Sequence, residues 1–360
     1  MNGEEKAKTL FPILPSTTGM VRMAEQAEHV DDGHDVEFCG MKVSGILNRS
    51  VSKRMHWMAW SINPYRGCEF GCRYCYARYT HEFLAPKDGP VEGQPNFHDP
   101  EVFERKIFVK ENAAWLLEQE LRRLEKQGHI TDEIALGTAT DPWQPIERRQ
   151  KVTRSLLEVL ARRSGIRLGI VTKSTLILRD LDLLQEIARK SVLVVHLTIT
   201  TPDVELARKL EPRAPRPDLR LATVQKLRQA GIIVGVLNSP LLPGITDTMT
   251  AIDRMAKLAA DHGACFFAAN PLFLKPCSRP TYLSFIREHF PDLEPEYARR
   301  FQDRDFADKA YAARLSAMVT AICRKHGLNK RAMDSLLSQE SAQKMPAAAV
   351  RGLAQQRLFG

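Results

Sequence analysis

Short apolar runs alternate with amphipathic segments of helical period from about residue 56 onward. The apolar runs lie at 57–62, 134–136, 167–172, 191–198, 232–237 and 264–268, and the helical segments at 111–126, 154–163, 178–190, 219–230 and 248–262. The runs lack polar alternation, as strands buried on both faces do. Strands that alternate with helices favour βαβ units and a parallel sheet. Since a closed barrel of this kind needs about eight strands, the sequence predicts an α/β fold, an open partial (β/α)6 TIM-like barrel.

The 360-residue chain divides into four predicted parts. Residues 1–50 mix Gly, Pro, Ser and charges and predict an irregular N-terminal arm, with a candidate strand or docking segment within 36–47. Residues 51–275 form the barrel core. Residues 276–345 predict a helical C-terminal extension, and 346–360 a flexible tail that follows Met345-Pro346.

Three of the seven cysteines occur in the spacing Cys68-x3-Cys72-x2-Cys75. Thiolates are the usual protein ligands of iron–sulfur clusters, and a loop with three of them leaves one iron of a cubane open to a small molecule. Three other interpretations remain: a structural zinc site with His81 as fourth ligand, a ferredoxin-type site that recruits the distant Cys265, and a chance group of buried cysteines. An odd number of cysteines in a long chain argues against a disulfide framework.

The charge balance is basic, with a formal net charge of +9. Residues 298–360 contain 12 Lys and Arg against 5 Asp and Glu, a pattern typical either of nucleic-acid contact or of a solvated helix face. No apolar run approaches the roughly 18 residues that a membrane span needs. Residues 1–8 lack the apolar segment of a secretory signal, so we expect a cytoplasmic protein without membrane contact.

The cysteine loop resembles the signature of the radical S-adenosylmethionine (SAM) superfamily, which has an aromatic residue, here Tyr74, before the last cysteine. The resemblance implies an enzyme in which Cys68, Cys72 and Cys75 bind a [4Fe–4S] cluster whose open iron chelates SAM. It further implies that one electron from a flavodoxin- or ferredoxin-type reductant cleaves SAM to methionine and a 5′-deoxyadenosyl radical, which abstracts a hydrogen atom from the substrate. Residues 51–275 would then be the radical SAM core.

Within that superfamily the chain resembles the spore photoproduct lyase-like branch. The matching segments are Asn-Pro-Tyr-Arg-Gly-Cys at 63–68, Gly-Thr-Ala-Thr-Asp-Pro-Trp within 137–147, and 172–174, 197–201, 210–213 and 240–244. One departure matters. Spore photoproduct lyases use a cysteine near the second-strand motif to return a hydrogen atom, and residues 136–141 contain no cysteine. The resemblance therefore implies SAM radical chemistry without implying repair of the thymine photoproduct.

Polar residues that follow the predicted strands are the candidate cofactor contacts, because barrel enzymes build their sites at the carboxyl ends of strands. The candidates are Tyr74 near the adenine, Lys173 for the SAM carboxylate, Thr140 and Thr198 as hydroxyl donors, Asp141 for the ammonium or ribose, and Glu211 and Arg213 for the ribose or carboxylate. For Asp141 and Glu211, a turn or a helix cap beside the following proline is the alternative.

The chain end carries a second pattern, Gln355-x-x-Leu358-Phe359. This spacing resembles the peptide by which bacterial DNA replication and repair proteins bind the sliding clamp; a frayed terminus is the alternative. Taken together, the sequence favours a radical SAM enzyme acting on an unidentified substrate, with nucleic acid as one candidate. The alternatives are radical SAM modification of a peptide or small metabolite, and a non-catalytic iron–sulfur binding or redox protein.

Overall fold

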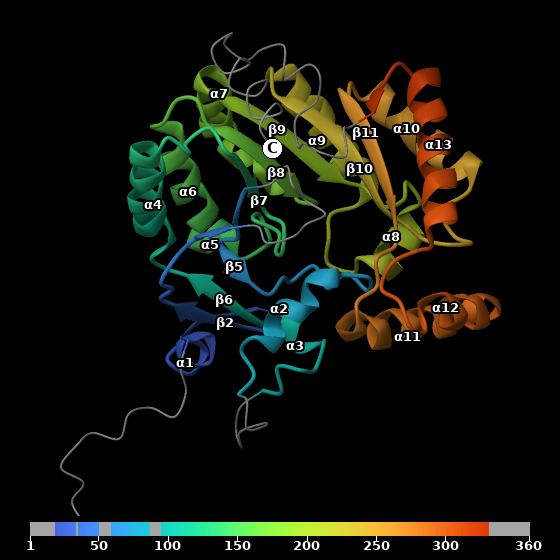
Figure 1. The fold of residues 1–360 in the computed structure, drawn as a ribbon, viewed down its shortest axis with the longest axis horizontal. Coiled ribbons are helices and arrows are strands. Elements are labelled where there is room, and N and C mark those ends of the chain that lie inside the picture. Colours follow the sequence, from blue (N-terminus) through green and yellow to red (C-terminus); the bar gives the residue numbers. More distant parts are fainter. Residues whose placement is uncertain (1–18, 34, 50–58, 87–94, 331–360) are drawn as a thin grey trace, which may run out of the picture.

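An eight-stranded sheet forms the centre of the structure, a computed structural model that describes residues 19–33, 35–49, 59–86 and 95–330. Its strand order is β12-β11-β10-β9-β8-β7-β4-β3, and every neighbouring pair is parallel except β3 and β4. The sheet has two edges, so the predicted open partial barrel is confirmed (Figure 1).

The six predicted strands are all present in this sheet. They are β4 (Trp60–Ile62), β7 (Glu133–Leu136), β8 (Arg167–Thr172), β9 (Val192–Thr198), β10 (Ile233–Leu241) and β11 (Phe266–Pro271). Residues 57 and 58 of the first predicted run lie outside the described residues. The central strands are buried on both faces, which explains why their sequences show no polar alternation.

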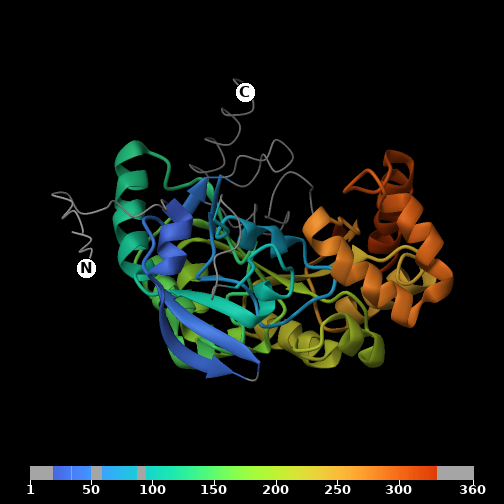
Figure 2. The same cartoon turned by 90° about the horizontal axis from the view of Figure 1, so that it is seen from below.

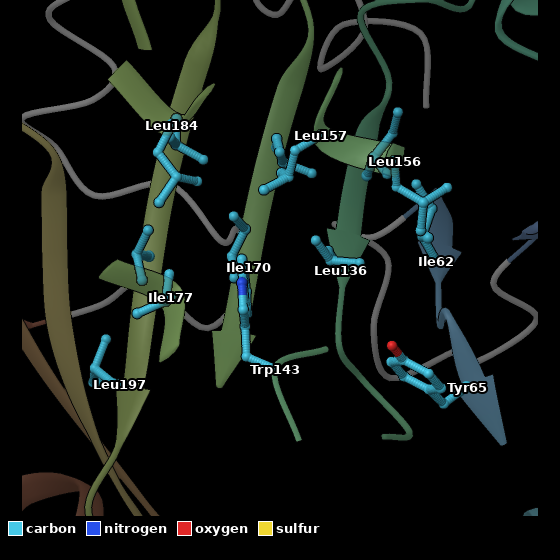
Figure 3. Packing of buried hydrophobic residues seen from close by; sticks show 14 of the residues in the cluster. Ile62, Tyr65, Leu136, Trp143, Leu156, Leu157, Ile170, Ile177, Leu184 and Leu197 are labelled. Atoms are coloured by element: carbon cyan, nitrogen blue, oxygen red, sulfur yellow. The ribbon is translucent and has the colours of Figure 1, made fainter. Parts of the chain in front are cut away.

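Helices cover the outer face of the parallel sheet (Figure 1). They are α4 (Ala113–Gln127), α6 (Val152–Ala161), α7 (Leu181–Lys190), α9 (Pro217–Gln229) and α10 (Met249–Asp261). The short α5 (Glu147–Gln150) and α8 (Val204–Leu210) follow the ends of β7 and β9. Leu136 and Ile170 of neighbouring strands pack with Leu156 and Leu157 of α6 in one core cluster (Figure 3). This apolar layer fixes the strands, and therefore the positions at which each strand ends.

The N-terminal arm predicted for residues 1–50 is not irregular where the structure describes it. After α1 (Gly19–Glu25), strands β1 (Glu28–Gly33) and β2 (Val36–Met41) form a hairpin, and β3 (Leu47–Arg49) joins the main sheet. β2 belongs to a second sheet of order β1-β2-β6-β5, with β5 (Tyr65–Arg66) and β6 (Lys106–Lys110) (Figure 2). β2 lies within the candidate strand of residues 36–47, and its buried residues pack in the main core.

The segment between β4 and β7 carries further short elements. They are α2 (Tyr79–Glu82) and α3 (Val102–Arg105), with the 3-10 turn η1 (Tyr76–Arg78) before α2. These elements lie beyond the end at which the parallel strands terminate (Figure 1).

The described part of the C-terminal extension is mostly helical. It contains η3 (Pro276–Ser278), α11 (Arg279–His289), η4 (Pro291–Leu293), α12 (Glu294–Phe301) and α13 (Lys309–Lys325). One strand was not predicted: β12 (Asn329–Lys330) pairs with β11 in parallel. The predicted tail 346–360 and the clamp-type pattern at 355–359 lie outside the described residues. Across the described chain, we find no helix that is both long enough and apolar enough to cross a membrane.

Candidate functional site

A cavity of about 480 Å³ opens at the carboxyl ends of the parallel strands, a volume within the usual range of small-molecule sites. Each of the six predicted strands, or the loop that follows it, contributes lining residues. The lining includes Cys68, Cys72 and Cys75 after β4, residues 137–141 after β7, Thr172 and Lys173 at β8, Thr198 at β9, Ser239 and Pro240 of β10, and Asn270 and Phe273 at β11. The topology therefore brings together segments that are far apart in sequence.

The three cysteines of the loop line one wall of this cavity. Cys68 and Cys72 are buried and Cys75 is partly buried, and none of the seven cysteines is in a disulfide. Burial raises the pKa of the Cys72 thiol to about 12. A thiol in such surroundings ionises readily only when a cation takes the place of its proton.

The loop is fastened to the segment after β7 by buried side-chain amides and a carboxylate. The Asn63 side-chain oxygen accepts from the backbone N–H of Ala139 at 2.8 Å. The Gln144 side chain accepts from the N–H of Glu69 at 2.9 Å and donates to the carbonyl of Gly67 at 3.3 Å. The carboxylate of Glu69 in turn accepts from the N–H of Ile146 at 2.8 Å. These bonds fix the cysteine loop relative to the second strand.

Two arginines fasten the loop from the other side. Arg78 forms a buried ion pair with Glu104 at 2.6 Å and donates to the carbonyl of Cys72 at 3.1 Å. Arg213 donates to the carbonyls of Glu69 at 3.1 Å and Glu104 at 3.3 Å. Backbone carbonyls need donors when they are buried, so both arginines stabilise the loop conformation.

Tyr74 connects the loop to a buried polar cluster behind the cavity wall. Its ring lines the cavity, and its hydroxyl is hydrogen-bonded to Thr200 at 2.7 Å and to Glu211. Glu211 also accepts from Thr200 at 2.9 Å and forms an ion pair with Arg220 at 2.5 Å. Burial would raise the pKa of Glu211, but the charges of Arg220 and Lys173 outweigh burial and lower it. The Glu211 carboxylate is therefore ionised behind Tyr74.

Asp141 lines the cavity, and its carboxylate accepts hydrogen bonds from three groups of the protein. It accepts hydrogen bonds from the Thr172 hydroxyl at 2.7 Å, the N–H of Lys173 at 2.7 Å and the N–H of Trp143 at 2.9 Å. Burial raises the pKa of Asp141 although these three donors oppose the shift. The residue thus joins the ends of β7 and β8.

Lys173 is the cation of the cavity wall. Its ammonium lies 5.6 Å from the centroid of the Tyr74 ring, a cation–π distance. Burial would lower its pKa, but the electrostatic attraction of the Cys72 sulfur and the Glu211 carboxylate outweighs burial and raises it. A positively charged Lys173 therefore faces the same cavity as the three thiols.

Five of the seven predicted cofactor contacts lie at the cavity, and two do not. The five are Tyr74, Thr140, Asp141, Lys173 and Thr198. Glu211 and Arg213 do not line the cavity; Glu211 lies behind Tyr74, and Arg213 contacts the cysteine loop from outside. The sequence placed both residues near the end of the fourth strand. It does not indicate whether their side chains point into the cavity or lie behind its wall.

Sequence reasoning missed several lining residues. Ser239 accepts from the backbone N–H of Asn270 at 3.0 Å and from its side chain at 3.2 Å, which links the ends of β10 and β11. The aromatic rings of Tyr76 and Phe273 also line the cavity. Position at a strand end was an available signal for Ser239 and Asn270, and adjacency to Cys75 for Tyr76.

The donor set fits a cluster with three thiolate ligands better than the alternatives. Among the residues that the structure describes, no group of three His, Cys, Asp or Glu side chains is placed to hold a single metal ion. Three thiolates that bind three different irons have no need to converge on one ion. His81 does not line the cavity, and its Nε2 lies 3.0 Å from the carbonyl oxygen of Lys106. Cys265 precedes β11 at the opposite end of the sheet, so neither residue can complete a four-ligand site.

The sequence pattern of the radical SAM superfamily matches residues 62–256. An uncharacterized protein of Mycobacterium tuberculosis is 32% identical over 297 residues, which cover 81% of this chain and 83% of the relative. An uncharacterized protein of Methanocaldococcus jannaschii is 31% identical over 186 residues, 52% of this chain and 61% of the relative.

Two solved structures of spore photoproduct lyase share the fold. A mutant with bound AdoMet and dinucleoside spore photoproduct superimposes with a TM-score of 0.59 at 16% identity, over 80% of this chain and 78% of that protein. A complex with the dinucleoside spore photoproduct gives a TM-score of 0.58 at 15% identity, over 80% and 79% of the two chains. At this identity the likeness concerns the fold.

Proposed function

Because this chain belongs to the radical SAM superfamily, we propose that it is an enzyme that cleaves SAM at a [4Fe–4S] cluster bound by Cys68, Cys72 and Cys75. Members of this superfamily use a [4Fe–4S] cluster and SAM. When both are bound, they supply one-electron cleavage of a carbon–sulfur bond and a 5′-deoxyadenosyl radical. The observation that carries the proposal is the convergence of three thiols with Lys173 and two threonines in one cavity.

Lys173, Thr140 and Thr198 are the residues we assign to SAM. The ammonium of Lys173 is the cation suited to pair with the α-carboxylate of SAM. Thr140 and Thr198 line the same cavity and supply hydroxyl groups for the carboxylate or the ribose. The ring of Tyr74 offers a flat surface near the adenine. Asp141 keeps the backbone N–H of Lys173 in place and thereby orients the end of β8.

Glu211 and Arg213 act in this proposal as positioning residues. Glu211 holds the hydroxyl of Tyr74 and balances the charge of Arg220. Arg213 holds two carbonyls of the segments around the cysteine loop. Neither residue needs to touch SAM to affect its binding, because each keeps one part of the cavity wall in position.

In this proposal no cysteine returns a hydrogen atom to the product radical, in contrast to the cysteine step described above for spore photoproduct lyases. All seven cysteines are described, and Cys68, Cys72 and Cys75 are the cysteines that line the cavity. A fourth thiol to serve as hydrogen donor is therefore not available at the cavity wall. In this proposal the hydrogen atom that quenches the product radical comes from another group or from 5′-deoxyadenosine.

A one-electron donor of the flavodoxin or ferredoxin type is the partner that this chemistry requires. We place the enzyme in the cytoplasm, where such donors and reduced thiols coexist. A purely electron-carrying protein would not need a lysine and two threonines at the strand ends facing its cluster, which favours the enzyme over that alternative.

The test is anaerobic reconstitution with iron and sulfide, reduction with dithionite, and addition of SAM. We expect 5′-deoxyadenosine and methionine in equal amounts from the wild type and none from Cys75→Ala. Cys323→Ala serves as the control, since Cys323 is buried in the core and does not line the cavity. A reducible cluster that leaves SAM intact would support the binding-protein alternative instead.

A further inference from the structure

Three aromatic rings form a continuous row at the rim of the cavity. Tyr76 and Phe273 both line the cavity, and their ring centroids lie 6.0 Å apart. Phe273 stacks on Phe306 with a centroid distance of 4.2 Å and an angle of 15° between the ring planes. Tyr76 is 41% exposed and Phe306 42% exposed. The row therefore leads from the cavity wall to the surface, and we call it the aromatic rim (Tyr76, Phe273 and Phe306).

Hydrogen bonds and a β-bridge hold the rings of the rim in place. The Tyr76 hydroxyl donates to the carbonyl of Thr138 in the segment after β7. Phe306 belongs to the connection between α12 and α13, and it forms an isolated β-bridge with Phe273. The backbone N–H of Leu274 donates to the carbonyl of Asp305 at 2.9 Å. The C-terminal extension thus returns to the barrel mouth and delivers one ring of the rim.

A cation lies beside this row. The ammonium of Lys275 is 4.0 Å from the centroid of the Tyr79 ring and 5.9 Å from that of Phe273. Within the described chain it forms no ion pair with a carboxylate, whereas Asp305, the residue before Phe306, is paired with Arg279 at 3.0 Å. The flat faces of the rim therefore lie next to a positive charge that has no carboxylate partner in the part of the chain that the structure describes.

We propose that the aromatic rim binds an unpaired base of a single-stranded or locally opened nucleic acid, with Lys275 on a neighbouring phosphate. The inference rests on the proposed function, since it names the substrate class that would reach the SAM cavity. Bases stack on exposed aromatic rings whatever their sequence, and Lys neutralises the adjacent backbone. A hydrophobic peptide could bind the apolar surface of the rim but would not need Lys275. The net charge of +9 also favours a polyanionic ligand.

The test is fluorescence anisotropy of the full-length, anaerobically reconstituted protein with a labelled single strand of roughly 12 nucleotides, a length within the usual range of single-strand sites. Phe306→Leu keeps the apolar volume but loses the flat ring, and we expect it to weaken binding roughly 5- to 100-fold. Phe306→Tyr keeps the ring and should bind like the wild type. Trp115→Leu is the matched control, because Trp115 is a 65% exposed aromatic on α4 that does not line the cavity.

Two further measurements separate stacking from charge. An abasic strand of the same length should bind more weakly than the strand with bases, and equal affinity would overturn the proposal. Lys275→Gln should make the affinity for the strand less dependent on salt. The loss of about one phosphate contact should reduce the slope of log Kd against log salt concentration by roughly 0.7.

The same preparations are assayed for 5′-deoxyadenosine, so that binding of the strand by the rim and cleavage of SAM are tested independently. Intact SAM cleavage without binding of the strand would overturn the rim proposal alone. Binding of the strand that depends on Phe306, in a protein that leaves SAM intact, would overturn the proposed function alone. Equal affinity of wild type and Phe306→Leu would also contradict the rim proposal.

Discussion

Glu211 and Arg220 form an ion pair at 2.5 Å in which each side chain is 1% exposed, and the pair lies directly behind Tyr74 of the cysteine loop. Arg220 also donates to the carbonyl of Thr198 at 3.0 Å. One buried pair therefore supports both the aromatic residue before the last cysteine and the end of β9.

Removal of one member of this pair should destabilise the fold strongly. Arg220→Met leaves the carboxylate of Glu211 buried without its cation, and we expect a loss of about 3 to 5 kcal/mol in the free energy of unfolding. The surface pair Lys257 and Asp261 is the control: Lys257→Met should cost less than about 1 kcal/mol. Urea denaturation of the metal-free proteins measures both. Equal losses for the two variants would contradict a structural role of the buried pair.

His81 should make the fold sensitive to acid. Its Nε2 donates to the carbonyl of Lys106 at 3.0 Å, while its Nδ1 is buried without a partner among the described residues. Burial lowers the pKa of His81 to about 3, from 6.5. The pKa of His81 is lower in the folded protein than in the unfolded chain, so burying the neutral ring costs no protonation free energy above about pH 6.5. As the pH falls from there toward 3, the unfolded chain binds the proton and the free energy of unfolding decreases.

The measurement is the free energy of unfolding at pH 7 and pH 5 for wild type and His81→Phe. Phenylalanine keeps a ring against Phe103 but binds no proton. We expect the wild type to lose about 2 kcal/mol more than the variant between the two pH values. The same pH dependence in both proteins would show that His81 does not contribute.

Gly137 should tolerate no side chain. Its φ is +89°, and an added Cβ would lie 2.4 Å from the carbonyl oxygen of Val171 and 2.7 Å from Pro142. Gly128 has a similar φ of +76° but open space around it. Gly137→Ala should therefore destabilise the protein by at least about 1 kcal/mol more than Gly128→Ala, as thermal or urea unfolding would measure. Equal costs would mean that the loop after β7 can shift.

Six of the seven parallel strands were predictable because their buried runs are local signals in the sequence. In the second sheet, β2 lies within the candidate strand of residues 36–47, but its pairing was not predictable, since β2 pairs with β6 across a long stretch of chain and β5 has only two residues, Tyr65 and Arg66. Such non-local pairings leave no periodic pattern in either strand. The arm predicted as irregular therefore proved to contain a hairpin.

The candidate site was predictable to the extent that strand ends define it. Lys173 and Thr198 lie at the cavity because the carboxyl ends of parallel strands meet at one edge. The direction of a side chain after a strand is set by tertiary contacts, which is why Glu211 lies behind the wall instead of in it. Phe306 comes from the C-terminal extension, and no local signal connects that segment to the barrel mouth.

Lys173 should govern the affinity for SAM. Lys173→Met removes the cation assigned to the SAM carboxylate, and we expect SAM binding to weaken roughly 10- to 100-fold with the cluster retained. Lys257→Met, at an exposed position on α10, is the matched control and should bind SAM normally. Titration of the reconstituted proteins with SAM measures the effect. Unchanged affinity in Lys173→Met would remove the residue from the SAM site.

The most direct measurement of the central claim is iron and acid-labile sulfide per chain after anaerobic reconstitution. The wild type, Cys265→Ala and Cys323→Ala should contain about four of each, as a [4Fe–4S] cluster requires. Cys68→Ala, Cys72→Ala and Cys75→Ala should each lose the cluster. Wild-type iron and sulfide in all three of these variants would contradict the assignment of the cysteine loop.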